Sequence, residues 1–522
     1  MTRWSRLALV CLAAQLAAWA VIASADWPPS GYPLDDAWIH ELAARNLVEH
    51  GVLGVNPHVY GSGATSPIWA LTLSLGALLR ITPPWFSNGL NLLLLLLTGQ
   101  LVLRLLVNDG LPASKALPLA VAFGCAPNYV WFALSGMEAT FVSFLSVAAV
   151  AAWFSPNSRT RLLAGVAAAA LCLARPEGAL IVPLLLILRR PGSRAEWLSC
   201  LLVPASAVSL NAVLNLWWTG QLLPSTFAGR RWLWLTPLEG IGLVGRGELL
   251  VLDWLTRLGE FTLGTRTAWL IWISVGVAAL GLRTISGPGM RALMAWTVVW
   301  FGVYAAVLPT FGHGGRYQPL VPSLFLLLCC AGAIRLADSW RALVTGDRRF
   351  VNGALTVLAV LLTAIGPGMA LLVWRDGHSS AVRHVNDTEA AMGVQLRALP
   401  PDVRIASFDI GGIGYFSGRP IIEIGGLTDP RVVPYLREGR IADYLKSERV
   451  NYLVLPLGYT NTRPDPWNFY FRLGLDQAPD LGLEPVKRDT SELMLWRRGL
   501  RTTLHSSPVQ ALYRVNAEPQ AP

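Results

Sequence analysis

Leu34-Asp35-Asp36-Ala37-Trp38-Ile39-His40 begins a hydrophilic stretch that lies between the first apolar segment of the chain and the second. The two adjacent carboxylates precede a helix-like run from Glu41 to Glu49. A loop rich in Gly, Asn and Ser then leads to Ser62-Gly63-Ala64-Thr65-Ser66-Pro67. Charged residues are sparse in the apolar segments on either side. A dense set of polar groups at one membrane face is typical of a functional site, so we place the site in this stretch.

The composition indicates an integral membrane protein. Of the 522 residues, 53% are hydrophobic and 14% are charged, whereas a soluble chain of this size carries about a quarter charged residues. Apolar runs of about 17–25 residues recur, and such runs fit the ~30 Å hydrocarbon core of a bilayer. The net charge is +10, but the arginines sit mostly in short loops. This pattern is an orientation signal rather than a nucleic-acid-binding surface.

The first apolar run, from Leu7 to Ser24, follows Arg3 and Arg6. Ala23-Ser24-Ala25 resembles a signal-peptidase site, so cleavage is an alternative to a retained helix. The run is longer than the usual ~7–15-residue core of a signal peptide, and we therefore expect a retained first helix. In either case the basic flank stays in the cytoplasm and the Asp35-Asp36 pair lies outside.

Basic residues predict the rest of the topology. The run 66–81 is short and Pro83-Pro84 follows it, so we place it along the outer interface. The Lys and Arg residues of the later turns then fall on the cytoplasmic side, whereas a spanning 66–81 would invert three of these turns. This predicts about eleven spans, with the N-terminus inside and the C-terminus outside. The further runs cover residues 87–107, 116–134, 139–154, 162–175, 178–189, 197–217, 267–283, 291–310, 317–336 and 351–374.

Two of these runs, 162–175 and 178–189, are short and meet at Arg175-Pro176-Glu177-Gly178. A Pro-Gly break beside an Arg and a Glu is tolerated in a membrane only against protein or water. The break therefore predicts a polar interior position at the outer face.

Residues 375–522 are polar and rich in proline, which predicts a second domain. Helical patterns fit 387–398 and 439–448, and β-type runs occur at 403–408, 421–424, 452–455 and 493–496. The predicted fold is thus mainly α: a membrane helical bundle over residues 1–374, with its first outer loop at 25–86, and an extracytoplasmic (periplasmic) α/β domain over 375–522.

The carboxylate pair Asp35-Asp36 suits sugar transfer to a hydroxyl group. Such a transfer needs a base to take the proton of the acceptor, and a carboxylate at the membrane face can do this. A second acid can position a donor, an acceptor or a divalent cation, or raise the pKa of its neighbour. The alternative is two solvated acids that cap the following helix.

Several motifs resemble those of GT-C-fold membrane glycosyltransferases, and in particular bacterial arabinofuranosyltransferase-like members. They begin in the first loop and continue over most of the chain. The resemblance implies a sugar donor on a polyprenyl-phosphate carrier and an acidic pair at the catalytic centre, but the motifs do not specify the sugar or the acceptor. They are Leu34–His40, Ala44-Arg45-Asn46-Leu47, Asn56-Pro57, Gly61–Trp69, Ser135-Gly136-Met137-Glu138, Ala174–Gly178, Gly220 with Pro224 and Thr226, Gly315-Arg316-Tyr317 with Pro319, Phe408–Gly411 with Gly414-Tyr415, and Gly426-Leu427-Thr428-Asp429.

The resemblance assigns roles to the acidic residues. Asp35 is our candidate general base, with Asp36 and Glu138 as further catalytic residues. In the superfamily a second acidic site in an outer loop assists catalysis or binds metal. A divalent cation at Asp36 and Glu138 is therefore possible, although this chain has Glu138 alone where some relatives have an acidic pair. The alternative for Glu138 is a carboxylate satisfied by water at the interface.

Arg175 and Arg316 are the candidates for binding the donor phosphate, because the topology puts both at the outer face and guanidinium groups suit an anionic lipid headgroup. The alternatives are snorkelling to the interface and, for Arg175, a pair with Glu177. The candidates for substrate binding are His40, Arg45, Ser66 and Tyr317.

Other sites find little support in the sequence. His40, His50 and His58 lack the spacing of a metal site, so surface or acceptor contact is expected of His40. Gly411-Gly412-Ile413-Gly414 lacks the full dinucleotide-binding pattern. The six cysteines all lie in apolar runs, which excludes a disulfide framework in the C-terminal domain.

The predicted function is transfer of a sugar, with inversion, from a polyprenyl-phosphate donor to a glycan, lipid or protein acceptor at the outer face of the bacterial cytoplasmic membrane. One alternative is a transporter or flippase of a lipid-linked glycan. Transporters place ionisable residues near the bilayer midplane, whereas the mid-span positions here are almost free of charge. The other alternative is a catalytically inactive scaffold that presents the C-terminal domain.

Overall fold

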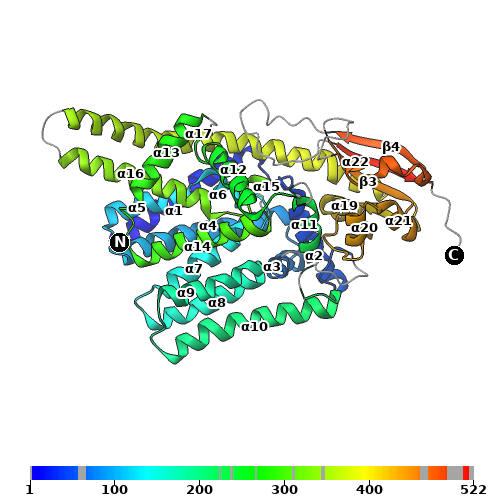
Figure 1. Cartoon of the computed structure of the whole chain (residues 1–522), viewed down its shortest axis with the longest axis horizontal. Coiled ribbons are helices and arrows are strands. Elements are labelled where there is room, and N and C mark those ends of the chain that lie inside the picture. The colour runs from blue at the N-terminus through cyan, green and yellow to red at the C-terminus, as the bar shows by residue number, and fades with distance from the viewer. Residues whose placement is uncertain are drawn as a thin grey trace.

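A bundle of helices forms the larger part of the molecule, and a small sheet with short helices lies at one end of it (Figure 1). The structure is a computed structural model of the chain. It describes residues 3–56, 66–222, 224, 226–235, 238, 240–264, 267–308, 312–342, 347–458, 468–490 and 509–516.

Apolar helices confirm that the chain is a multi-pass membrane protein. Six helices of the described part are long and apolar enough to cross a membrane, and further apolar helices are shorter. The predicted total of about eleven spans is not confirmed by these lengths. The long ones lie within Trp4–Asp26, Pro83–Asn108, Arg194–Trp217, Pro288–Val307, Leu320–Arg341 and Gly353–Leu396, and the shorter ones are Pro67–Leu78, Ala113–Gly124, Ala139–Trp153, Pro176–Leu188 and Trp269–Gly281.

Most helices follow the predicted apolar runs, but the predicted run 116–134 is divided into two helices by a break before Pro127. An apolar run forms a helix in lipid because the helix pairs its own backbone groups. Their bounds are α1 Arg3–Ala23, α3 Pro67–Leu78, α4 Pro83–Asn108, α5 Ala113–Gly124, α6 Pro127–Phe132, α7 Ala139–Trp153, α8 Ser158–Ala174, α9 Ile181–Leu188, α10 Arg194–Thr219, α13 Ala268–Gly281, α14 Pro288–Val307, α16 Leu320–Ala342 and α17 Asp347–Val385.

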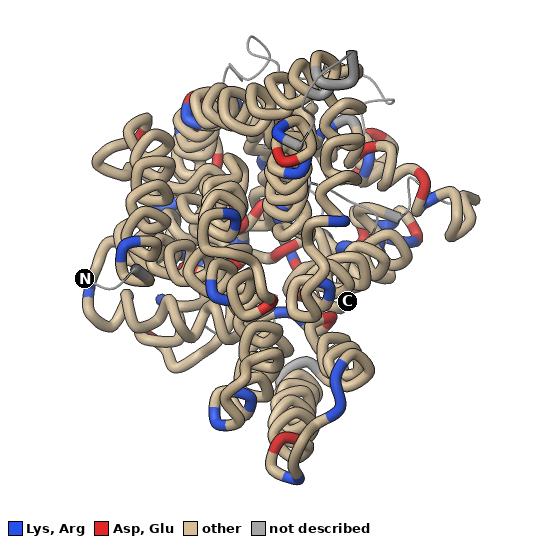
Figure 2. The backbone as a smooth tube through the Cα atoms, turned by 90° about the vertical axis from the view of Figure 1, so that its left-hand side faces the viewer, with Lys and Arg blue, Asp and Glu red and all other residues tan. Residues whose placement is uncertain are grey.

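Several turns between these helices gather at the end of the bundle away from the sheet. Asp109, after α4, accepts hydrogen bonds from the backbone N–H groups of Gly289 and Met290 at the start of α14, at 3.0 and 2.7 Å. Lys115 on α5 lies 2.6 Å from Asp338 on α16. Figure 2 looks at this end and shows Lys and Arg at the turns. The structure therefore brings these turns to one end of the bundle, and the side of the membrane that this end faces stays a prediction.

Two amphipathic helices were not predicted. They are α11 (Thr226–Leu235) and α12 (Leu243–Leu263). Charged residues interrupt the apolar residues of both, so neither forms a continuous apolar run. The predicted break after Arg175 is present, since α8 ends at Ala174 and a 3-10 turn, Pro176–Leu180, precedes α9.

The C-terminal domain contains a mixed sheet in the order β2-β1-β3-β5-β4. β1 pairs in parallel with β2 and β3, and β5 is antiparallel to β3 and β4. The predicted runs 403–408 and 421–424 contain β1 and β2, and the run 452–455 matches the first four residues of β3. The run 493–496 lies outside the described residues. The strands are β1 Ile405–Ser407, β2 Ile421–Glu423, β3 Tyr452–Leu457, β4 Leu483–Thr490 and β5 Val509–Val515.

Short helices complete this domain and join it to the bundle. The predicted boundary after Trp374 lies inside α17, which continues to Val385 and is followed by a π-helical turn, Asn386–Ala390. The domain core joins strands and helices through Ala406, Ile424, Leu436 and Leu453, among others. The remaining helices are α18 Ala391–Leu396, α19 Gly411–Ser417, α20 Val432–Glu438, α21 Ile441–Ser447 and α22 Phe469–Arg472.

Candidate functional site

Helix α2 (Asp35–His50) lies between the bundle and the C-terminal domain and separates the two carboxylates of the Asp pair. The Asp35 carboxylate accepts hydrogen bonds from the backbone N–H groups of Gly411 and Gly412 in α19, at 3.0 and 2.6 Å. The Asp36 carboxylate instead faces the bundle, where its Oδ2 lies 3.0 Å from Nη1 of Arg316. The two adjacent acids therefore belong to different environments.

Asp36 is held as an ionised carboxylate by positive charge. Nε2 of His313 lies 3.8 Å from its Oδ2, in addition to the contact with Arg316. Burial alone would raise the pKa of Asp36, but the charges of Arg316, His313 and Arg230 hold it well below its ordinary value. Its side chain keeps 22% of its surface exposed, whereas that of Arg316 keeps 1%. Asp36 is thus an ionised and partly exposed acid of this network.

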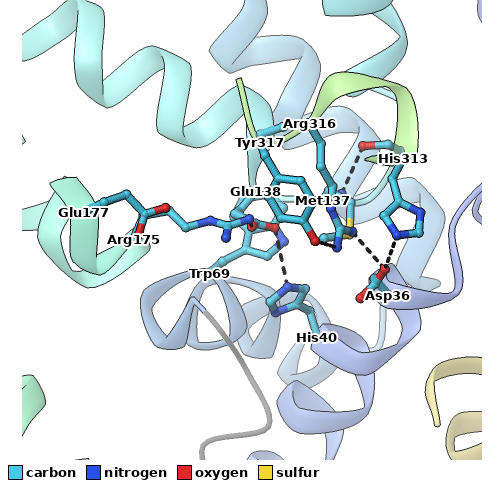
Figure 3. A network of polar contacts seen from close by, with 12 residues as sticks. Asp36, His40, Trp69, Met137, Glu138, Arg175, Glu177, His313, Arg316 and Tyr317 are labelled. Carbon is cyan, nitrogen blue, oxygen red and sulfur yellow. Dashed lines mark hydrogen bonds and ion pairs between the residues drawn. The ribbon is translucent and has the colours of Figure 1, made fainter. Parts of the chain in front are cut away.

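The turn before Arg316 places that side chain (Figure 3). His313, Gly314 and Gly315 all have positive φ, of 54°, 71° and 81°. A β-carbon at Gly314 would approach Trp131 to 2.8 Å, so a larger residue does not fit there. The sequence predicted Arg316 as a site residue but not His313, although the histidine directly precedes the glycine pair.

Glu138 binds Arg175 and so does not face open solvent. Both are buried, and Nη2 of Arg175 donates a hydrogen bond to the Glu138 carboxylate. Nε2 of the buried His40 lies 3.5 Å from the other carboxylate oxygen. Although burial alone would raise the pKa of Glu138, the charge of Arg175 and the hydrogen bond from His40 hold it below its ordinary value. Glu138 and His40 therefore support Arg175 (Figure 3).

Tyr317 lies among guanidinium groups. Its ring centre is 4.8 Å from Cζ of Arg316, 5.4 Å from Cζ of Arg175 and 5.5 Å from Cζ of Arg230. Such distances allow cation–π attraction, which orients the arginines around the ring. Nη2 of Arg316 also donates a hydrogen bond to the Tyr317 hydroxyl group at 2.9 Å. Tyr317 therefore joins the Asp36 side of the network to the Arg175 side.

Arg230 on α11 was not predicted, and it connects this network to a cavity of about 300 Å³. Arg175, Glu177 and Arg230 contribute the charged part of the cavity wall. The rest of the wall is mainly apolar and comes from the 3-10 turn Pro176–Leu180, from α11 and the segment that precedes it, and from the end of α14: Pro176, Pro224, Thr226, Phe227, Val303, Tyr304, Val307 and Leu308. The arrangement can hold an anionic group at the charged part and an apolar chain along the remainder.

Two predicted substrate-binding residues lie elsewhere. Nη1 of Arg45 donates a hydrogen bond to the carbonyl oxygen of Tyr415 in α19 at 2.8 Å, so Arg45 contacts the C-terminal domain. Ser66 is fully buried before α3, and its carbonyl oxygen accepts from the N–H groups of Trp69 and Ala70. The neighbouring positions 62–65 lie outside the described residues.

The predicted metal ligands Asp36 and Glu138 make different contacts. Asp36 pairs with Arg316, and Glu138 pairs with Arg175. In the part of the chain that the structure describes, no group of three or more His, Cys, Asp or Glu side chains is arranged to hold a metal ion. A role for a divalent cation at these two residues stays a prediction.

Solved structures match this arrangement over nearly the whole chain. ArnT from Cupriavidus metallidurans, in its apo state, is 13% identical, with a TM-score of 0.54 and coverage of 100% of both chains. The apo oligosaccharyltransferase of Archaeoglobus fulgidus is 12% identical, with a TM-score of 0.60, and the match covers 95% of this chain and 75% of that one. The chain has a GT-C fold. The predicted fold class is therefore confirmed.

The GT-C fold has a further solved example in AglB from Archaeoglobus fulgidus, an archaeal oligosaccharyltransferase in complex with an inhibitory peptide and a dolichol-phosphate. It is 12% identical, with a TM-score of 0.57, and the match covers 96% of this chain and 76% of that one. Residues 380–492 match a domain of unknown function, DUF8728. No curated protein matches the sequence.

Proposed function

We propose that this protein is a membrane glycosyltransferase that transfers a sugar from a polyprenyl-phosphate donor to a cell-envelope acceptor. The basic turns at the opposite end of the bundle support a site on the outer face of the cytoplasmic membrane. The observation that carries the proposal is the cavity lined by Arg175 and Arg230. The Tyr317 ring, which lies beside Arg230 and Arg316, joins this cavity to the ion pair between Arg316 and Asp36. A GT-C protein, AglB, binds a dolichol-phosphate, which supports a lipid phosphate as the occupant here.

The donor phosphate binds the guanidinium groups of Arg175 and Arg230 in this proposal, and the prenyl chain follows the apolar wall. Glu138 keeps Arg175 in place through a buried ion pair, and Tyr317 lies beside both arginines. Charge-assisted hydrogen bonds to phosphate are stronger than neutral ones, and guanidinium groups match the geometry of phosphate. Arg230 therefore joins Arg175 and Arg316 as a proposed donor-binding residue.

The contacts favour Asp36 over Asp35 as the general base. Both acids are half-buried, but both oxygens of Asp35 accept hydrogen bonds from backbone N–H groups of α19, whereas the Asp36 carboxylate faces Arg316. Asp36 is ionised when the site is empty, so it can accept a hydrogen bond from an acceptor hydroxyl group. A bound phosphate would draw Arg230 and Arg316 toward its own charge. This would raise the basicity of Asp36 when the donor is in place.

The reaction in this site is a displacement at the anomeric carbon of the donor sugar. The acceptor oxygen forms a bond to that carbon, and the bond between the carbon and the phosphate oxygen breaks. The proton of the acceptor passes to Asp36, and polyprenyl phosphate leaves with the bonding electron pair. Arg175 and Arg230 stabilise the negative charge that develops on the leaving phosphate. Attack from the side opposite the phosphate inverts the configuration of the sugar.

Binding of undecaprenyl phosphate tests the donor site without knowledge of the sugar. Arg230→Ala should weaken binding to the purified full chain about 10–100-fold, because it removes a charge-assisted contact of roughly 1.5–3 kcal/mol. Arg231→Ala is the matched control, since Arg231 is the neighbouring exposed arginine on α11 and is not part of the cavity wall. Equal affinity of the two variants would contradict the assignment of the cavity.

Turnover tests the catalytic role. Undecaprenyl-phosphate pentoses and hexoses are offered with a cell-envelope extract as acceptor, and transfer of labelled sugar is measured. Asp36→Asn should lower turnover about 10²–10⁴-fold while undecaprenyl phosphate still binds. If Asp36→Asn retains the wild-type rate while Asp35→Asn is inactive, Asp35 is the base that the sequence predicted. Full activity of both variants would refute the mechanism.

A further inference from the structure

Helix α2 carries Asp36 on one face and binds the C-terminal domain through another. Successive residues of an α-helix point about 100° apart, so adjacent side chains face different neighbours. The rings of Trp38 and Tyr415 lie 4.7 Å apart, and Arg45 donates to the Tyr415 carbonyl group. Asp35 contacts the same helix, α19, at Gly411. These residues of α2 recur at positions i, i+3 and i+10, and they form one continuous face toward α19.

Asp35 supplies the hydrogen-bond acceptor that the start of α19 lacks. The first backbone N–H groups of a helix have no partner within it, and a side chain usually accepts from them. The residue before α19 is Ile410, which has no acceptor in its side chain. Asp35, 376 residues earlier in the chain than Gly411, accepts from Gly411 and Gly412 instead. The contact therefore completes α19 and holds the start of α2 against it.

The C-terminal domain also contacts the opposite wall of the site, at α11. A β-carbon at Gly229 would overlap the carbonyl oxygen of Gly426 and would lie 2.6 Å from that of Gly425. The side chain of Arg472 donates to the carbonyl oxygen of Leu233. Arg230 directly follows Gly229 and lines the cavity. One domain thus holds both the helix that carries Asp36 and the helix that carries Arg230.

We propose that the C-terminal domain is a positioning element for both sides of the site: it sets Asp36 through the contact of Asp35 with α19, and it sets Arg230 through the packing of Gly229 against the loop at Gly425-Gly426. The inference rests on the proposed function, because it takes Asp36 as the base and Arg230 as a donor-binding residue. Asp35 is then a positioning residue. A displacement of about 1 Å in a catalytic group can cost on the order of 10²-fold in rate.

Glycine-to-alanine changes test the two contacts without replacing a charged residue. In Gly411→Ala the new β-carbon would overlap the backbone oxygen of Asp35, so α19 and α2 must separate. In Gly229→Ala it would overlap the loop at Gly426, so α11 must move. Gly368→Ala in α17 is the matched control, because a β-carbon there meets no atom within 4 Å. Alanine favours helices over glycine at all three positions.

The measurements distinguish a loss of positioning in the site from a general loss of folding. In the full chain, Gly411→Ala should speed hydrogen exchange of α2 and lower kcat roughly 10–100-fold, with the affinity for undecaprenyl phosphate unchanged. Gly229→Ala should instead weaken that affinity about tenfold or more, the loss of one charge-assisted contact. Gly368→Ala should change neither. Asp35→Ala, the second variant for the first contact, should match Gly411→Ala in kcat. Inactivation by Asp35→Ala far beyond Gly411→Ala would overturn the positioning role.

The outcomes also distinguish this inference from the proposed function. Absence of transfer by the wild type with every undecaprenyl-phosphate sugar would refute the proposed function. Unchanged exchange of α2 in Gly411→Ala, or wild-type kcat despite faster exchange, would overturn the positioning role. Wild-type affinity for undecaprenyl phosphate in Gly229→Ala would overturn the second contact.

Discussion

Replacement of Glu138 by Gln tests the buried network directly, because it removes one charge and preserves the shape of the side chain. Glu138 is 1% exposed and Arg175 is 5% exposed, and the two form an ion pair. The change leaves a buried guanidinium group without its principal partner. Breaking a buried pair in this way costs about 3–5 kcal/mol. The charge of Glu177 also acts on Arg175, so we expect the lower end of that range, about 3 kcal/mol.

Unfolding of the purified full chain in one detergent measures this cost. The matched control is Glu438→Gln, because Glu438 pairs with Arg440 at 3.0 Å while both side chains are more than half exposed. An exposed pair contributes little, so the melting temperature of this variant should stay close to that of the wild type. The double variant Glu138→Gln/Arg175→Met should recover much of the loss, because it no longer buries an unpaired charge.

Two results would refute this reasoning. If Glu138→Gln melts together with Glu438→Gln and the wild type, then Arg175 is not held by a buried charge pair. If the double variant is as unstable as Glu138→Gln, then the loss does not come from an uncompensated guanidinium group. Binding of undecaprenyl phosphate should raise the melting temperature of Glu138→Gln more than that of the wild type, because the phosphate neutralises Arg175.

Two further predictions concern pH and topology. Burial and the nearby Glu389 carboxylate raise the pKa of Asp409 from 3.8 to about 7. The protonated form is thus favoured in the folded state, and its contribution to stability is lost as the pH rises through about 7; the melting temperature should fall between pH 5 and pH 8, and less so in Asp409→Asn. A reporter enzyme fused to the C-terminus should be active outside the cytoplasm, and activity inside would reverse the proposed orientation.

The fold could largely be predicted because lipid imposes a simple requirement on sequence. A spanning helix exposes apolar side chains over its whole length, so α4, α14 and α16 appear as uninterrupted runs. α11 and α12 escaped detection because they bury apolar residues against protein on one face and carry charges elsewhere. β4 was missed for a similar reason: half of its residues, Leu483–Thr490, are charged and most are exposed, and it is held by pairing with β5.

The site was predicted in part. Arg230, one of the two residues that were missed, shows why the prediction was incomplete. Arg175 and Arg316 were predicted because the topology puts both at the outer face, whereas the Lys and Arg residues of the other turns fall on the cytoplasmic side. Arg230 and Arg231 are adjacent in an amphipathic segment, and no feature of the sequence distinguishes them. The rotation of α11, set by the packing of Gly229 on the C-terminal domain, turns Arg230 toward the cavity. The signal in the sequence that could have indicated Arg230 is that the two arginines closely follow Pro224 and Thr226.

The sequence by itself determined that an acidic pair precedes a helical run after the first apolar segment, because residue type and local periodicity are properties of neighbouring positions. In the structure the helix begins at Asp35 itself, earlier than the predicted run from Glu41. Only the tertiary structure decided which groups each of the two acids contacts. Asp35 contacts backbone amides of α19, which follow it in the chain by more than 370 residues, and Asp36 meets Arg316 from a third segment. The physical reason is that helical geometry points adjacent side chains in different directions. Only the packing of distant segments supplies the groups that each of the two side chains contacts.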